Sequence, residues 1–314
     1  MSDEQELDPQ AAAFLTAIGQ RNARGVSELS PEEARVAHNA SARELSGPGE
    51  AVAKVEDVTL RTGQNCDLPL RVFRPRAATG NCVVLYFHGG GWVVGNLDTY
   101  DPLCRNLAND ARAIVISVGY RLAPEYQYPS QIEDALVALR WVIERQHDWS
   151  PDGVRVIVAG DSAGGNLAAV LTAQAHVDGL HVAGQVLIYP MLDPHLSYPS
   201  IVERGKGFFV SVEDVRWYWE QYLPDRAPAD RADVAPLQIE DLSHIPPTLI
   251  LTAGFDPLRD EALAYADRLE HAGVAVTRMD FPGQIHGFVR FTARISAARS
   301  AIGRIGQFIS DLSR

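Results

Sequence analysis

The sequence predicts an α/β protein with a mostly parallel sheet that helices cover on both faces. Short apolar runs alternate with helical patterns along most of the chain, which is the order expected of parallel strands joined by helices. Runs such as Val83–Phe87 and Ala113–Val118 are continuously apolar, as in strands that are buried on both faces. In Arg155–Val170 a strand, a sharp turn and a helix follow one another directly. With 314 residues, 46% of them hydrophobic, the chain can bury a large core.

The sequence pattern of residues 1–50 predicts helices and no strand. The first helical pattern covers Pro9–Gln20. Ser30 and Glu33 form a capping box with Pro31 at the first helical position, which predicts a second helix running towards Leu45. A Ser-Gly-Pro-Gly stretch then ends this pattern. We expect the segment to pack on the core from outside.

Strands and helices alternate through the rest of the chain. Val55–Arg61 and Leu68–Arg74 alternate apolar and polar residues around a Gly-containing turn, which predicts an antiparallel hairpin at a sheet edge. The other predicted strands are Val83–Phe87, Ala113–Val118, Val156–Ala159, Gln185–Tyr189, Thr248–Ala253 and Ala275–Phe281. The predicted helices are Leu103–Ala111, Gln131–Arg145, Asn166–Val170, Glu261–His271 and Ile295–Leu312.

One long segment interrupts this alternation. Residues 190–247 lie between two predicted strands and are too many for a plain connection. A helix start at Ser211–Asp214 is followed by a group of aromatic residues, namely Trp217, Tyr218, Trp219 and Tyr222. We interpret the segment as an excursion that returns over the top of the sheet as a cap. An ordinary surface helix whose aromatic side chains pack on the core remains the alternative for Trp217 and Trp219.

Charge and cysteine content limit the partners and the compartment. Lys and Arg total 28 and Asp and Glu total 40, so the net charge of −12 argues against nucleic acid or an anionic membrane as partner. Cys66, Cys82 and Cys104 match no metal or redox spacing and are typical of reduced thiols in a cytosolic protein. The polar, acidic start is unlike a secretory signal, and no apolar run has the length of a membrane span. We expect a cytoplasmic protein; a homodimer stays open.

The residues 160–164 form a G-x-S-x-G pattern between a strand and a helix. This context is typical of a nucleophile elbow, in which Ser162 takes a strained backbone conformation that exposes its hydroxyl. Gly160 and Gly164 have no side chains, so the strand and the helix can approach closely. The pattern alone has low specificity. A Gly-rich strand–helix turn that binds phosphate is the alternative.

A serine nucleophile needs a base, and the base needs an acid that orients it. In an elbow protein the acid and then the base follow the serine along the chain. Asp256 lies in the loop after the predicted strand Thr248–Ala253 and is the favoured acid. Asp260 and Glu261 stand where a helix begins, and capping explains them. His286 follows the last predicted strand and is the favoured base.

A glycine triplet follows the predicted strand Val83–Phe87, in the stretch His88–Trp92. Its backbone amides, together with that of Ala163, are expected to donate to the oxyanion of a tetrahedral intermediate. A flexible loop or a dinucleotide fingerprint would also use glycines, but the fingerprint fails because position 94 is valine. We expect His88 to hold this loop rather than to transfer protons.

Five ordered motifs resemble those of hormone-sensitive-lipase-like (bacterial family IV) carboxylesterases of the α/β-hydrolase superfamily. They are HGGGW at 88–92, YRLAPE at 120–125, GDSAGGN at 160–166, DPLRDE at 256–261 and HGF at 286–288. The resemblance covers about residues 50–314 and implies an eight-stranded α/β-hydrolase core, residues 51–189 and 248–314, under a helical cap. The cap would comprise residues 1–50 and 190–247. The resemblance also implies carboxylic ester hydrolysis without a cofactor or metal.

The same resemblance implies roles for individual residues. Ser162 would be the nucleophile, His286 the base and Asp256 the residue that orients it. The oxyanion donors would be the amides of Gly89, Gly90 and Ala163, with Gly91 as the alternative to Gly89. Because His286 must be neutral to accept a proton, we expect activity to rise as the pH leaves the acid range.

The substrate is expected to be a small ester with a short or medium acyl chain. Five residues near the serine could line an apolar pocket, namely Trp92, Asp161, Tyr189, Phe208 and Phe209, although core packing explains the aromatic ones equally well. An amidase, a lactonase or a peptidase could use the same three residues. A non-catalytic ligand receptor on this scaffold is less favoured, because a receptor is free to lose the nucleophile and its partners, and this chain keeps them.

Overall fold

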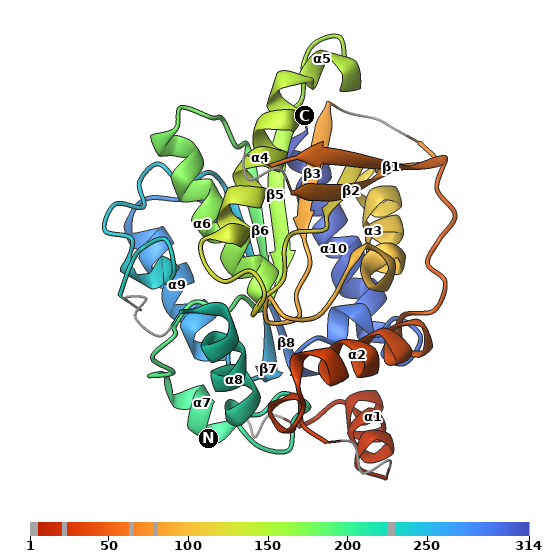
Figure 1. The fold of residues 1–314 in the computed structure, drawn as a ribbon, viewed down its shortest axis with the longest axis vertical. Coiled ribbons are helices and arrows are strands. Elements are labelled where there is room, and N and C mark those ends of the chain that lie inside the picture. Colours follow the sequence, from red (N-terminus) through yellow and green to blue (C-terminus); the bar gives the residue numbers. More distant parts are fainter. Residues whose placement is uncertain (1–5, 21–23, 63–65, 78–80, 225–229, 314) are drawn as a thin grey trace.

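The computed structural model describes residues 6–20, 24–62, 66–77, 81–224 and 230–313. Within them lies an eight-stranded sheet in the spatial order β1-β2-β4-β3-β5-β6-β7-β8 (Figure 1). β2 pairs antiparallel with β1 and β4, and the other neighbouring pairs are parallel. The strands are β1 (Lys54–Arg61), β2 (Asp67–Arg74), β3 (Cys82–Phe87), β4 (Ile114–Val118), β5 (Arg155–Asp161), β6 (Gly184–Ile188), β7 (Thr248–Phe255) and β8 (Val276–Ile285). The predicted α/β class with a mostly parallel sheet is confirmed.

Helices cover both faces of this sheet (Figure 1). α3 and α10 pack on one face together with α1, while α4, α6 and α9 bury their apolar residues against the other face. The helices are α1 (Pro9–Gln20), α2 (Pro31–Ser46), α3 (Leu97–Ala111), α4 (Ser130–Glu144), α5 (Gln146–Trp149), α6 (Ala163–Val177), α7 (Pro199–Glu203), α8 (Val212–Tyr222), α9 (Arg259–His271) and α10 (Ser296–Leu312). Three short 3₁₀ turns add η1 (Val26–Glu28), η2 (Pro236–Gln238) and η3 (Phe288–Arg290).

Most predicted elements appear within a few residues of their expected bounds, and three differ more. The helix predicted over Asn166–Val170 runs from Ala163 to Val177. α3 begins at Leu97 rather than Leu103, because Asn96 caps it by accepting from two backbone amides and the helix accommodates Pro102 in its interior. β8 continues to Ile285 instead of ending near Phe281. The predicted edge hairpin of β1 and β2 is present, and the glycine of its turn lies outside the described residues.

The long segment 190–247, here called the insertion, contains α7, α8 and η2. In Figure 1 its helices lie at the same end of the molecule as α1 and α2. Asn166 of α6 donates from its side-chain amide to the carbonyls of Met191 and Val234, each at 2.9 Å. The start of the insertion and a point in its second half are thereby fastened to the helix that follows Ser162.

The N-terminal segment also contacts the insertion. Asp214 of α8 accepts from the backbone amide and the hydroxyl of Ser27, at 3.0 and 2.8 Å. The predicted capping box at Ser30 is present, and the predicted helix start at Ser211 also has a capping box, with Asp214 as its second member. These contacts join the two helical segments to each other at the end of the sheet where the parallel strands finish.

Candidate active site

The turn from β5 into α6 holds Ser162 in a strained conformation. Its φ and ψ are 55° and −120°, a combination that L-residues rarely adopt outside functional sites. The chain passes very close to itself here. A Cβ atom on Gly160 would lie 2.2 Å from the carbonyl oxygen of Gly164, and one on Gly164 would lie 2.0 Å from that of Phe87. Glycine is therefore required at both positions, as in the turn that the sequence predicts.

Ser162, His286 and Asp256 form one hydrogen-bonded relay. The Ser162 hydroxyl lies 3.0 Å from Nε2 of His286, and Nδ1 of the same ring lies 2.7 Å from Oδ2 of Asp256. The other carboxylate oxygen of Asp256 accepts from the amide of Leu258 at 2.8 Å. The three side chains are almost fully buried. They come from the ends of three different strands, β5, β7 and β8.

The bonding of this relay fixes what its groups can do. The Asp256 carboxylate is an acceptor, so Nδ1 of His286 carries the proton between them. Nε2 then presents its lone pair to the Ser162 hydroxyl, which donates to it. A hydroxyl that donates to an oriented imidazole is activated for attack on a carbonyl carbon. The arrangement is therefore suited to acyl transfer.

The glycine loop after β3 rests on the carboxylate of Asp161. Oδ1 of Asp161 accepts from the Gly89 amide and from the Tyr86 hydroxyl, and Oδ2 accepts from the Tyr100 hydroxyl, each at 2.9 Å. Burial raises the pKa of Asp161, and these donors oppose that effect. Both oxygens are used inside the protein, which argues against the predicted contact of Asp161 with substrate.

The bond to Asp161 also changes the set of oxyanion donors. The Gly89 amide already donates to Asp161, which argues against the prediction of Gly89 as a donor to substrate. Among the described residues, the amides of Gly90, Gly91 and Ala163 have no hydrogen-bond acceptor. Gly90 and Gly91 have φ values of 106° and 58°, which suit glycine and turn these amides away from a regular strand or helix. Gly91, the alternative named from the sequence, thus has an amide that is free to donate, whereas the amide of Gly89 is not.

The side chain of His88 contacts the backbone of the glycine loop. Its Nδ1 lies 2.8 Å from the carbonyl oxygen of Gly89, and its ring stacks on that of Tyr120 with centroids 4.3 Å apart. Burial lowers the pKa of His88 to about 4, so the ring is neutral near pH 7. It does not contact the relay through any hydrogen bond within the described part of the chain. The structure fits the expected role of holding the loop.

Two aromatic residues of the insertion lie against the loops on which the site is built. A Cβ atom on Gly91 would lie 1.9 Å from the ring of Tyr218, and one on Gly287 would lie 3.5 Å from the ring of Phe209. Phe209 is 41% exposed and was predicted as a pocket residue. Tyr218 was not selected, because helical spacing within an aromatic run does not show which ring faces the glycine loop.

The remaining predicted pocket residues are packing residues in this structure. Trp92 is fully buried and stacks on Tyr222, with ring centroids 4.1 Å apart. Tyr189 is buried beside the ring of His286, at 4.6 Å between centroids. Phe208 packs against Phe255 at 5.0 Å. Trp92 and Tyr189 thus support the glycine loop and the histidine from behind.

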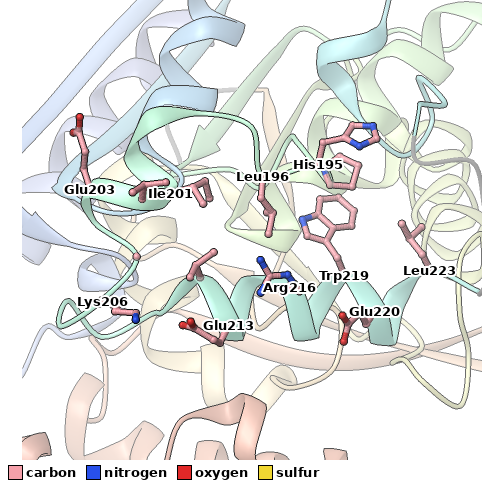
Figure 2. A pocket seen from close by; sticks show the side chains of 14 residues that line it. His195, Leu196, Ile201, Glu203, Lys206, Glu213, Arg216, Trp219, Glu220 and Leu223 are labelled. Atoms are coloured by element: carbon pink, nitrogen blue, oxygen red, sulfur yellow. The ribbon is translucent and has the colours of Figure 1, made fainter.

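A cavity of about 840 Å³ opens within the insertion, between α8 and the segment that leads into α7 (Figure 2). Its apolar lining includes Leu196, Ile201 and Trp219, and charged side chains of both signs stand around it. None of the three relay residues lines it. Trp219 also contacts Trp92, with centroids 4.5 Å apart. The Trp219 indole therefore lies between this insertion cavity and the residue that follows the glycine loop.

The described residues meet neither the requirements of a metal-ligand cluster nor those of a membrane-spanning helix. No group of three or more His, Cys, Asp or Glu side chains there is arranged to hold a metal ion. Likewise, no helix in the described ranges has both the length and the apolar character needed to span a bilayer.

Comparisons with known proteins agree with this geometry. Residues 84–290 match the family model described as alpha/beta hydrolase fold. An ethyl acetate hydrolase from Pseudomonas putida is 38% identical over 303 residues, which cover 93% of this chain and 95% of that protein. Carboxylesterase NlhH from Mycobacterium tuberculosis is 41% identical over 270 residues, covering 83% of this chain and 84% of its own. The solved structure of ester hydrolase EH1AB1 from the Lake Arreo metagenome superposes with a TM-score of 0.92 at 35% identity, covering 97% of this chain and 98% of that one.

Proposed function

The chain belongs to the alpha/beta hydrolase fold family and is a carboxylic ester hydrolase, and we propose that it works through an acyl-enzyme on Ser162. The observation that carries this proposal is the relay in which the Ser162 hydroxyl faces Nε2 of His286 at 3.0 Å while Asp256 holds Nδ1 at 2.7 Å. The roles assigned to the individual residues below are part of the proposal.

In the acylation step Ser162 attacks the ester carbonyl carbon. Its Oγ forms the new bond while its proton passes to Nε2 of His286. The carbonyl oxygen becomes an oxyanion, which accepts hydrogen bonds from the amides of Gly90, Gly91 and Ala163. When the tetrahedral intermediate collapses, the bond to the alcohol oxygen breaks and that oxygen takes the proton from His286. The acyl group stays on Ser162 as an ester.

In the deacylation step a water molecule repeats this sequence. The water gives a proton to Nε2 of His286 and attacks the acyl carbon, and the same amides receive the second oxyanion. Collapse releases the carboxylic acid and returns the proton to Ser162. Asp256 keeps the imidazole in the required tautomer throughout and stabilises the imidazolium that forms twice per cycle.

We propose that the substrates are small esters with short or medium acyl chains. Tyr218 and Phe209 close over the glycine loop and the histidine loop, and Trp219 stands between the glycine loop and the insertion cavity. Such a site favours a compact ester over a long chain. Amides and lactones could react at the same relay, so p-nitrophenyl esters, anilides and lactones belong in one substrate panel.

The domain division and the setting of the enzyme are also proposals. Residues 1–50 and 190–247 would form a cap over a core made of residues 51–189 and 248–314. The bonds from Ser27 to Asp214, which link these two segments, support this division. The free thiols of Cys82 and Cys104 support a reducing, cytoplasmic setting. Light scattering of the purified protein tests the homodimer, and a nucleic-acid shift assay tests the expected lack of such a partner.

The decisive experiment replaces the nucleophile. We expect Ser162→Ala to lower kcat for p-nitrophenyl butyrate by about 10⁶-fold. Ser117→Ala, which changes a buried serine of β4 outside the relay, is the matched control and should keep activity within about threefold. Mass spectrometry of the quenched wild type should also detect an acyl group on Ser162. A loss of less than tenfold in Ser162→Ala would remove this serine from the mechanism.

A further inference from the structure

Arg290 is a largely enclosed arginine without an ionic partner among the described residues. It ends η3, which follows His286 directly along the chain. Its Nε is buried and has no hydrogen-bond acceptor in that part of the chain. The guanidinium lies over the ring of Tyr100, with Cζ 4.6 Å from the centroid. Buried arginines normally pair with carboxylates, so an enclosed arginine without such a bond calls for an explanation.

Tyr100 connects this cation to the glycine loop. The Tyr100 hydroxyl donates to Oδ2 of Asp161, and Oδ1 of the same carboxylate accepts from the Gly89 amide. The glycine loop lies directly against Asp161 and Tyr100. A Cβ atom on Gly89 would lie 2.6 Å from Oδ2 of Asp161 and 3.0 Å from the Tyr100 hydroxyl oxygen. Any change in the bonding of Asp161 therefore reaches the loop that carries the Gly90 and Gly91 amides.

We propose that Arg290 is a positioning residue whose unpaired positive charge keeps Asp161 ionised and so keeps the glycine loop seated for catalysis. The inference rests on the proposed function, because it assigns the loop to the oxyanion. Asp161 accepts three hydrogen bonds, and a carboxylate can satisfy all of them. A protonated carboxyl group presents a hydroxyl at one oxygen, so a bond to Gly89 or to a tyrosine would be lost or reversed.

The charges around Asp161 agree with this assignment. Burial raises the pKa of Asp161, whereas the charge of Arg290 opposes that rise. The other titratable neighbours of Asp161 on the packed elements are neutral at pH 7, because burial raises their pKa values; they are Tyr86, Tyr100, Tyr120, Tyr189 and Cys104. Interactions within this low-dielectric region are screened little by water.

The groups that face Arg290 from the helices are also neutral at pH 7. Burial lowers the pKa of His38 on α2, and His88 behaves in the same way. Burial raises the pKa of Tyr218 on α8, with Asp214 as its acidic neighbour. Asp214 itself bonds to Ser27 and Ser211. Asp161 is therefore the carboxylate that the charge of Arg290 can stabilise next to the nucleophile.

The first test compares Arg290→Met with Arg290→Lys, which keeps the charge. In Arg290→Met, kcat/KM for p-nitrophenyl butyrate should fall at acidic pH. The acid limb of its pH profile, where activity rises with pH, should move to higher pH by about one unit or more. Asp161 would then take up its proton at a higher pH, and activity is lost as the pH falls through that value. The loss should lie in kcat rather than KM. Arg290→Lys should retain the wild-type limb. Arg294→Met, which removes a half-exposed arginine paired with Glu44 at 2.7 Å, is the matched control.

The second test needs no activity and uses the Ser162→Ala background. Infrared difference spectra between pH 8 and pH 5 should show the carbonyl stretch of a protonated carboxylic acid in Arg290→Met at a higher pH than with Arg290 present. The band should vanish when Asp161→Asn is added. If the acid limb and the infrared titration of Arg290→Met both match those of the parent, the proposal is overturned. If the infrared shift appears as expected but the protein with Ser162 intact hydrolyses no ester, the proposed function fails while the effect of Arg290 on Asp161 stands.

Discussion

Nε2 of His286 lies 3.0 Å from Oγ of Ser162, although 124 positions separate the two residues along the chain. β5 and β8 are parallel members of one sheet, so their carboxyl ends deliver both side chains to the same edge. The contact is long-range, and it depends on the intervening strands β6 and β7. Four predictions follow from the surroundings of this contact.

Replacing Asp256 by asparagine should impair catalysis without unfolding the protein. An amide can donate to Nδ1 of His286 and so favours the wrong tautomer, and we expect kcat to fall by about 10⁴-fold, as in other Ser-His-Asp relays. Asp260→Asn tests the neighbouring acid, which bonds to the amide of Ser200 and to Arg259 instead. It should keep kcat within about tenfold. Steady-state kinetics of both variants give the two kcat values. A larger loss of kcat in Asp260→Asn than in Asp256→Asn would contradict the assignment of Asp256 as the acid that orients His286.

Alanine at position 91 should disable the glycine loop. Its Cβ would lie 1.9 Å from the Tyr218 ring, and the φ of 58° is unfavourable for alanine. We expect kcat to fall by about 100-fold, in line with the loss of one oxyanion donor. Gly91→Ala combined with Tyr218→Ala should regain thermal stability, because the collision is removed. Equal melting temperatures for the single and double variants would contradict this placement of Tyr218.

Removing the Trp219 indole should enlarge the acyl site. Trp219 lines the insertion cavity of about 840 Å³ and contacts Trp92, so Trp219→Ala should extend the cavity to the Trp92 ring, which follows the glycine loop directly along the chain. We expect a stability loss of about 3–5 kcal/mol and a shift of kcat/KM from butyrate towards octanoate esters. Trp217→Ala on the same helix is the control, since Trp217 contacts Tyr218 rather than Trp92. If kcat/KM depends on acyl chain length in Trp219→Ala as it does in the wild type, the insertion cavity does not accommodate the acyl group.

Glu261 should make the protein less stable as the pH rises. It is fully buried, Oε1 accepts from the Leu192 amide at 2.6 Å, and Oε2 has no partner among the described residues. Burial raises the pKa of Glu261 well above its ordinary value, so the folded state keeps a proton that the unfolded chain releases. The free energy of unfolding therefore declines from the ordinary glutamate pKa, about 4.3, upward until the raised value is passed.

Glu261→Gln removes this dependence, because glutamine is neutral at every pH. Its melting temperature should exceed that of the wild type at pH 8, with the difference shrinking towards pH 4. Glu144→Gln, at an exposed position at the end of α4, should follow the wild type across the range. Parallel curves for wild type and Glu261→Gln would mean that Glu261 is ionised in the fold.

Local sequence patterns predicted the sheet and the three relay side chains because each has a short-range signal. Continuous apolar runs mark β3, β4 and β5 as buried strands. Ser162 and Asp256 come just after strands of this kind, and His286 comes after the last predicted strand. The start of α3 was misplaced because Pro102 resembles a helix start, whereas the cap is Asn96.

The donor set and the pocket could not be predicted in the same way. The use of the Gly89 amide by Asp161 depends on a contact across 72 positions, which no local pattern reveals. Whether Trp219 or Tyr218 faces the glycine loop depends on the rotation of α8, which its contacts with distant elements set. The burial of Arg290 over Tyr100 has no sequence signal, because an arginine in a short turn is ordinarily exposed.

The two bonds from the Asn166 side chain to Met191 and Val234 have an evolutionary consequence. They hold the backbone at Met191 and at Val234 against α6. The segment between these two residues can therefore become longer or shorter, or change in sequence, while the turn at Ser162 stays in place. New substrate preferences can therefore arise in that span without disturbing bond-breaking chemistry. A library randomised at 195–222 should retain far more active clones than one of equal size that includes Asn166.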